Sequence, residues 1–141
     1  MSGAPAVAVA VTFVWLGMVS AISFLEAPLK FRAPGVTLPL GLGIGRLVFR
    51  VLNAVEIAFV VVVVAVLTTA PMPARAAVAL GAAVAALLVQ VLAVRPALTR
   101  RSDRVLAGLD APRSRAHHVY IGLEVVKTIA LVVAGISLLA G

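Results

Sequence analysis

The chain has 141 residues, of which 63% are hydrophobic and only 12% are charged, and its mean hydropathy is +1.19. Soluble globular domains carry about a quarter charged residues, so this composition excludes that class and indicates a membrane protein. The formal net charge is +7 and the sequence contains no cysteine. The lack of cysteine excludes disulfides, iron–sulfur clusters and haem attached through thioethers.

Four apolar stretches are long enough to cross a hydrocarbon core of about 30 Å, which takes about 20 helical residues. They cover approximately residues 6–25, 47–69, 76–94 and 119–140. We expect the first to be a span and not a cleaved signal peptide, because no Lys or Arg precedes it and its apolar run is too long. The sequence therefore predicts an all-α fold, a single transmembrane domain whose four helices form a bundle.

The basic residues indicate how the chain is oriented. The second connection contains only Arg75, whereas the first and third contain Lys30, Arg32, Arg46, Arg50, Arg95, Arg100, Arg101, Arg104, Arg113 and Arg115. Short loops rich in Lys and Arg stay in the cytoplasm, so both termini are expected on the opposite side. The charge then favours anionic lipid headgroups as partners and not nucleic acid. Ten Arg against two Lys, with much Ala and Val, favour a GC-rich bacterial source and hence the bacterial inner membrane.

The two halves of the chain resemble each other. A shift of 68 residues places four residues on identical residues, namely Pro28 on Pro96, Arg32 on Arg100, Val51 on Val119 and Glu56 on Glu124. This internal repeat predicts two hairpins of the same orientation, related by an axis along the membrane normal. Such repeats are found in membrane transport proteins, although they are not confined to them.

The first and third connections are expected to be non-helical. Residues 27–45 are apolar but contain three Pro and four Gly, which predicts an interfacial loop, with a re-entrant segment as the alternative. Residues 95–116 are polar and charged, which predicts a solvated basic loop. A short surface helix over Ser102–Leu109 is the alternative there.

Glu56 and Glu124 lie inside long apolar runs at matching positions of the two hairpins. A carboxylate near the membrane core is costly, so each is a functional-site hypothesis. At 100° per residue, polar residues share one face of the second span and another face of the fourth, and both faces should point at protein. The candidates for a ligand or ion site are therefore Arg50, Asn53, Glu56, Tyr120, Glu124 and Lys127.

Both glutamates are expected at one depth, about 8 Å inside the cytoplasmic edge of the hydrocarbon. Glu124 can pair with Lys127 on its own helix, whereas Glu56 is left to Arg50, Lys127 or a shared proton. Two roles stay open. The polar residues can be glue between spans, or they can line a cytoplasm-facing cavity that binds a proton, an ion or an anionic headgroup.

Three other residues invite a specific role. His117 and His118 stand at the cytoplasmic start of the fourth span and point about 100° apart, so they cannot both ligate one haem iron, and no other His is present. We expect them to be interfacial, and we expect no metal and no cofactor. Trp15 lies in mid-span, where its indole N–H needs Ser20 or a polar group of another span.

Small residues at four-residue spacing predict close helix contacts. They are Gly17 with Ala21 in the first span, and Ala77, Gly81 and Ala85 in the third. The second set could serve either the bundle or a homodimer or larger oligomer.

The first half of the chain contains the segments WLGMVSAISFLEAPLKFRAPGV and GIGRLVFRVLNAVE. These resemble four-span bacterial membrane proteins grouped by a domain of unknown function and broadly similar to transmembrane protein 205. Separately, Arg50, Asn53 and Glu56 resemble the Arg-x-x-x-Asn-x-x-Glu signature of the membrane-associated proteins of eicosanoid and glutathione metabolism. Here the Arg50 to Asn53 spacing is one residue shorter, and the later arginine–tyrosine elements are not evident.

Together these features predict a small, non-enzymatic membrane protein that is transport-related or accessory, with a cytoplasm-facing polar site inside the bundle. The alternative is a membrane-embedded enzyme or lipid-binding protein acting on an amphipathic or thiol-conjugated substrate. For an enzyme, the second resemblance implies Arg50, Asn53 and Glu56 as the working parts.

Overall fold

The computed structural model describes residues 2–110 and 115–141, and these residues are helical almost throughout, with no strand among them. The first long helix comprises α1 (Gly3–Val19), the π-helical η1 (Ser20–Glu26), α2 (Ala27–Leu29) and the 3₁₀ turn η2 (Lys30–Arg32). The second is α3 (Leu38–Thr69). The third comprises α4 (Ala74–Val89), the π-helical η3 (Gln90–Val94) and α5 (Arg95–Leu106), and the fourth is α6 (Arg115–Ala140).

Four helices are long and apolar enough to cross a membrane. They run over Gly3–Arg32, Leu38–Thr69, Ala74–Leu106 and Arg115–Ala140, with 30, 32, 33 and 26 residues. Each exceeds the length of about 20 residues that a hydrocarbon core requires. The predicted all-α class with four membrane-length helices is confirmed, and the predicted spans are shorter than the helices that contain them.

The first connection is much shorter than predicted. Only residues 33–37 lie outside helices, so the expectation of an irregular segment over residues 27–45 is wrong. Pro39 stands in the first turn of α3, where no intrahelical N–H bond is lost, whereas Pro28 lies inside the continuous first helix, directly after the π-helical η1. The Thr37 hydroxyl accepts a hydrogen bond from the Leu40 N–H at 3.3 Å and caps α3.

The third connection also differs from the prediction. Residues 95–106 continue the third long helix, so the solvated loop expected there is wrong, and the alternative of a short separate helix over Ser102–Leu109 is replaced by this continuous one. Pro96 lies inside this continuous helix, directly after the π-helical η3, as Pro28 does after η1. The helix ends where Gly108 adopts φ 82° and the Leu109 N–H bonds the Arg104 carbonyl at 2.9 Å. Arg113 and Pro112, which belong to the predicted loop, lie outside the described residues.

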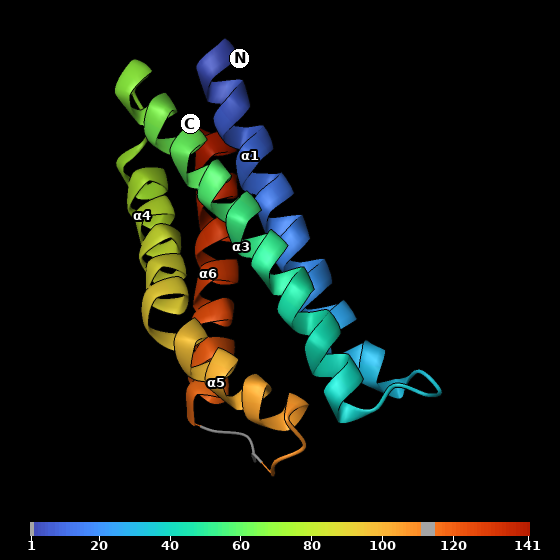
Figure 1. The fold of residues 1–141 in the computed structure, drawn as a ribbon. Helices are drawn as coiled ribbons and strands as arrows, with labels where there is room; N and C mark the ends of the chain where they lie inside the picture. The colour runs from blue at the N-terminus through green and yellow to red at the C-terminus, as the bar shows by residue number, and fades with distance from the viewer. Residues whose placement is uncertain (1, 111–114) are drawn as a thin grey trace.

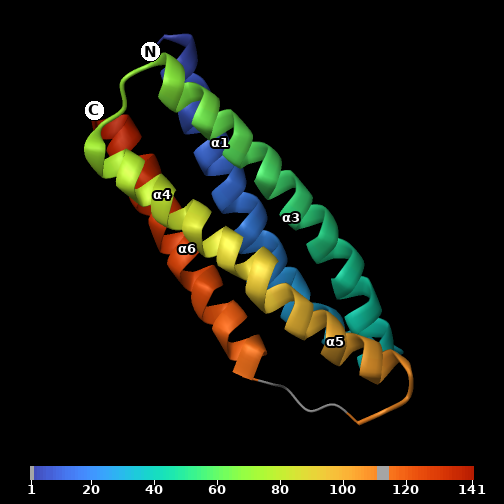
Figure 2. The ribbon, with the colours of Figure 1, turned by 60° about the vertical axis from the view of Figure 1, so that its left-hand side comes forward.

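The termini and the connection at residues 70–73 lie at one end of the molecule, and the other two connections lie at the opposite end, as Figure 1 shows. We call these the terminus end and the loop end. Helix α6 packs against α4 and α1, and α1 also packs against α3. Helix α5 reaches across to α3, as the turned view in Figure 2 shows, and an ion pair of 2.6 Å between Arg46 and Asp103 joins them.

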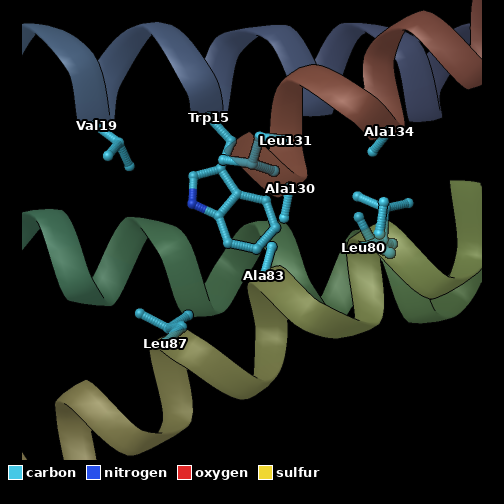
Figure 3. Close-up of a cluster of buried hydrophobic side chains, with 10 residues drawn as sticks. Trp15, Val19, Leu80, Ala83, Leu87, Ala130, Leu131 and Ala134 are labelled. Atoms are coloured by element: carbon cyan, nitrogen blue, oxygen red, sulfur yellow. The ribbon is translucent and has the colours of Figure 1, made fainter. Parts of the chain in front are cut away.

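The apolar core lies between α1, α4 and α6, around the fully buried Trp15. Figure 3 shows the indole extending from α1 between Ala83 and Ala130, with its nitrogen directed away from Leu80 and Ala134. Large apolar side chains cover much of the outer surface, from Val14 on α1 to Leu139 on α6. Such a surface suits hydrocarbon as the solvent.

The faces of small residues predicted from spacing do not pack within the chain. Gly17, Ala21, Gly81 and Ala85 are exposed and Ala77 is half-buried. Helix α4 instead buries the face formed by Ala76, Ala79, Leu80, Ala83, Ala86 and Leu87, because its larger leucines fill the space beside Trp15. A homodimer or larger oligomer through Ala77, Gly81 and Ala85 stays a prediction.

Candidate functional site

Lys127 of α6 is the centre of a buried polar network. Its side chain is fully buried, and its Nζ lies 2.6 Å from Glu56 Oε2 on α3 and 2.6 Å from Glu124 Oε1 on α6. The same ammonium donates to Gln90 Oε1 in η3 at 2.9 Å. An ammonium has three N–H donors, so these three acceptors satisfy it completely.

Glu56 is fully buried and has partners on three helices. Its Oε2 atom accepts from the Trp15 indole N–H at 2.8 Å as well as from Lys127, and its Oε1 atom accepts from Asn53 Nδ2 at 3.1 Å. Of the partners considered for Glu56, the structure therefore selects Lys127. The expectation that Trp15 needs a polar group of another span is confirmed, because Glu56 is that group.

Glu124 is held from both hairpins. Its Oε1 atom accepts from Gln90 Nε2 at 3.1 Å in addition to Lys127, and its Oε2 atom accepts from the Ser23 hydroxyl at 2.5 Å. Gln90 also lies 3.3 Å from the Tyr120 carbonyl. The predicted pairing of Glu124 with Lys127 is confirmed, but Ser23 and Gln90 were missed. The sequence does indicate a special role for Gln90, because it is the single Gln of the chain and stands inside an apolar run.

Both missed residues lie in π-helical segments, Ser23 in η1 and Gln90 in η3. A π-helical turn widens the helix and changes the direction of its side chains, and such turns are frequent at functional sites. Here each widened turn belongs to the first helix of a hairpin and directs one polar side chain at Glu124. Their positions are therefore part of how the site is built.

The network lies near the middle of the helices. Glu56 and Lys127 are each about 20 Å from the terminus end of their helices at 1.5 Å per residue, and Trp15 is about 18 Å from the start of α1. Two carboxylates and one ammonium carry a formal charge of −1 when all three are ionised. Burying an uncompensated charge is costly, so one proton on either carboxylate would leave the network neutral.

Arg50 does not join Asn53 and Glu56. Asn53 and Glu56 are buried, whereas Arg50 is exposed, so the expectation that all three share a protein-facing side is wrong. Arg50 and Glu56 differ by about 120° around the helix, and a long arginine side chain near the hydrocarbon edge turns toward water. The group that resembles the glutathione-family signature is therefore divided between two sides of α3.

Tyr120 lies on the same side of α6 as Glu124, but its ring contacts other residues. The ring packs edge-on against Phe49 at 5.8 Å, and the Arg95 guanidinium lies 4.8 Å from its centroid. Its backbone carbonyl touches the network through Gln90, and its buried hydroxyl lies beside Asn53 and Glu124. His117 is half-buried with its ring 5.7 Å from that of the exposed His118, at the start of α6 and about 14 Å along the helix from Lys127.

The network is closed, since Glu56, Gln90 and Lys127 are each fully buried. Two hollows of the described surface lie elsewhere. One is an apolar groove of about 570 Å³ between α4 and α6, and the other, of about 270 Å³, lies at the terminus end. Within residues 2–110 and 115–141, no three His, Cys, Asp or Glu side chains are grouped so as to hold a metal ion.

Comparison with known proteins does not assign this chain to a family. No protein-family model matches it, and no curated protein or solved structure matches it significantly. Its function must therefore be argued from the geometry of the network.

Proposed function

We propose that the chain is a multi-pass protein of the bacterial inner membrane, a transport-related four-helix bundle whose Glu56–Lys127–Glu124 network binds and releases a proton. The observation that carries this proposal is that one buried ammonium is shared by two buried carboxylates, each 2.6 Å away. A structural ion pair needs only one carboxylate. The second carboxylate adds a negative charge that has to be neutralised in the interior, and a proton is the smallest cation that can do so.

A metal cation fits this arrangement less well. The four carboxylate oxygens of Glu56 and Glu124 already accept hydrogen bonds from Lys127, Trp15, Asn53, Gln90 and Ser23. A hard cation such as Ca²⁺ needs about six or more oxygen ligands, so it would have to displace these donors. A proton needs one oxygen lone pair and leaves most of the donors in place.

The sharing of Lys127 provides two states of the network. When Glu56 is protonated, Lys127 keeps its contact with Glu124, and when Glu124 is protonated it keeps its contact with Glu56. Because the two glutamates belong to different hairpins, a proton that moves between them changes which hairpin the ammonium binds most strongly. Transport would couple that change to a rearrangement that opens the closed network to one side of the membrane.

The two hairpins are an internal repeat in this proposal. The 68-residue shift that relates Glu56 to Glu124 also carries residues 20–26 of η1 onto residues 88–94, which overlap η3. The basic loop end faces the cytoplasm, following the rule that Lys and Arg stay inside, and both termini face the periplasm. The alternative of an enzyme acting on a thiol conjugate draws no support from the exposed Arg50.

Proton movement can be measured with the purified protein in liposomes that contain a pH-sensitive dye. We expect wild-type protein to let protons follow an imposed potential, and Glu56→Gln and Glu124→Gln each to reduce the rate at least about tenfold. Glu26→Gln is the matched control, because Glu26 lies at the loop end and pairs only loosely with Lys30, at 3.7 Å. Wild-type rates in folded Glu56→Gln and Glu124→Gln, or no protein-dependent rate at all, would overturn the proposal.

A further inference from the structure

Arg95, the first residue of α5, lies against two aromatic rings. Its guanidinium carbon is 5.1 Å from the Phe49 ring centroid on α3 and 4.8 Å from the Tyr120 ring centroid on α6. The two rings meet edge-on at 5.8 Å. Cation–π contacts with both rings help to fix the position of the guanidinium, so three helices hold one cation in place.

Three polar groups here have no hydrogen-bond partner among residues 2–110 and 115–141. They are Arg95 Nε and Nη2, which are buried, and the hydroxyl of Tyr120, a residue only 7% exposed. Nε and Nη2 lie on the same edge of the guanidinium, which is the edge that grips a phosphate or carboxylate through two parallel hydrogen bonds. Buried donors without acceptors are costly, so the arrangement calls for an oxyanion.

The three residues lie at one level of the membrane. Phe49, Arg95 and Tyr120 are each about 30 Å from the terminus end of their helices, which is the thickness of the hydrocarbon core. The site is therefore at the depth of the lipid headgroups on the loop end. Basic pockets between helices at this depth on the cytoplasmic side bind anionic headgroups.

We propose that Arg95 and Tyr120, with Phe49 behind them, bind the phosphate of an anionic phospholipid headgroup. Leu92, which is exposed and lies nearly one turn deeper than Arg95 on the same long helix, offers apolar contact to an acyl chain that free phosphate cannot use. Glu124, one turn deeper than Tyr120 on α6, repels an anion and keeps the headgroup at the level of Arg95. Arg95 takes no part in the proton network, so the lipid site is tested at Arg95 independently of that network, whereas Tyr120 borders both.

The test uses the full chain in detergent and short-chain phosphatidylglycerol as the probe, with binding measured by native mass spectrometry and by thermal stabilisation. We expect Arg95→Gln to weaken binding about tenfold or more, and Arg95→Lys to weaken it several-fold because an ammonium lacks the two-pronged edge. Tyr120→Phe should weaken binding about threefold or more. Arg100→Gln is the matched control, with the same change of charge at an exposed position of the same helix, and should have less than about a twofold effect.

Three outcomes would overturn the inference. Equal losses in Arg95→Gln and Arg100→Gln would show general attraction to basic charge. Wild-type affinity in Arg95→Lys would show that a point charge suffices, and this variant keeps the positive charge if Arg95→Gln fails to fold. If inorganic phosphate binds as tightly as phosphatidylglycerol and Arg95→Gln weakens that binding, the ligand of Arg95 is free phosphate and not a lipid headgroup. Short-chain phosphatidylcholine, which has no net charge, should bind more weakly than phosphatidylglycerol.

Discussion

The Lys127 ammonium lies 2.6 Å from the Glu56 carboxylate and ties the last helix of the chain to the second. The two residues are 71 positions apart and both are fully buried. Lys127 makes an equal contact with Glu124 on its own helix, so a local ion pair and a long-range one share a single cation. Much of what the protein does, in folding as in the proposed proton exchange, then depends on that cation.

Replacing Lys127 with Met should destabilise the protein by about 3 kcal/mol or more, because it leaves two buried carboxylates without a counter-ion. The free energy of unfolding in mixed detergent would measure the loss. A triple variant that adds Glu56→Gln and Glu124→Gln removes the stranded charges and should recover part of the stability. Lys127→Met with wild-type stability would mean that the glutamates are neutral without help from the ammonium.

The effects of Glu56→Gln and Glu124→Gln on the free energy of unfolding should be strongly non-additive. Either Glu56→Gln or Glu124→Gln leaves Lys127 one carboxylate, so each single change is expected to lower the free energy of unfolding by about 1 to 2 kcal/mol, mainly because an NH₂ group replaces an oxygen among N–H donors. The double change also strands the ammonium and should cost about 3 kcal/mol more than the sum of the two single changes. A double-mutant cycle measures this coupling directly, and costs that simply add would contradict the shared role of Lys127.

The long apolar runs predict four helices, since burying backbone in lipid requires helices whatever the tertiary contacts. Spacing also predicts the buried polar face of the fourth helix, but on the second it wrongly includes Arg50 with Asn53 and Glu56.

Helix ends were harder. Proline and charge predict loops at residues 27–45 and 95–116, but Pro39 stands in the first turn of α3, and Pro28 and Pro96 each follow a π-helical segment inside a continuous helix. A helix that leaves the hydrocarbon can continue in water. The polar residues of that part then give the sequence the composition of a loop.

Partner choice could not be predicted either, because it depends on how the helices turn about their axes. Spacing alone placed Lys127 beside Glu124 but left Arg50 and Lys127 as equal choices for Glu56. The π-helical segments that aim Ser23 and Gln90 at Glu124 have no simple sequence signature. The unusual position of Gln90 in an apolar run was the one signal available.

Trp15 supports Glu56 from α1, so Trp15→Phe should destabilise the protein by about 1.5 to 3 kcal/mol through the lost hydrogen bond to a carboxylate. Phenylalanine keeps an aromatic ring against Phe59, whose centroid lies 6.2 Å away, but the smaller ring leaves a cavity that adds about 1 kcal/mol. Glu56→Gln made in the Trp15→Phe background separates the two effects. If the hydrogen bond matters because Glu56 is charged, Trp15→Phe should cost less there than in the wild type, as the two unfolding free energies would show.

The Arg46–Asp103 ion pair should behave differently from the network, although its atoms are just as close, at 2.6 Å. Its side chains are 30% and 57% exposed, whereas those of Lys127 and Glu56 are fully buried. Exposed pairs contribute little and are screened by salt, so Arg46→Gln should cost no more than about 0.5 kcal/mol, and less in high salt. The cost of Lys127→Met should hardly change with salt, because no ions reach the buried network. Unfolding free energies of both variants at low and high salt give the comparison, and a salt-sensitive cost for Lys127→Met would mean that the network is open to water.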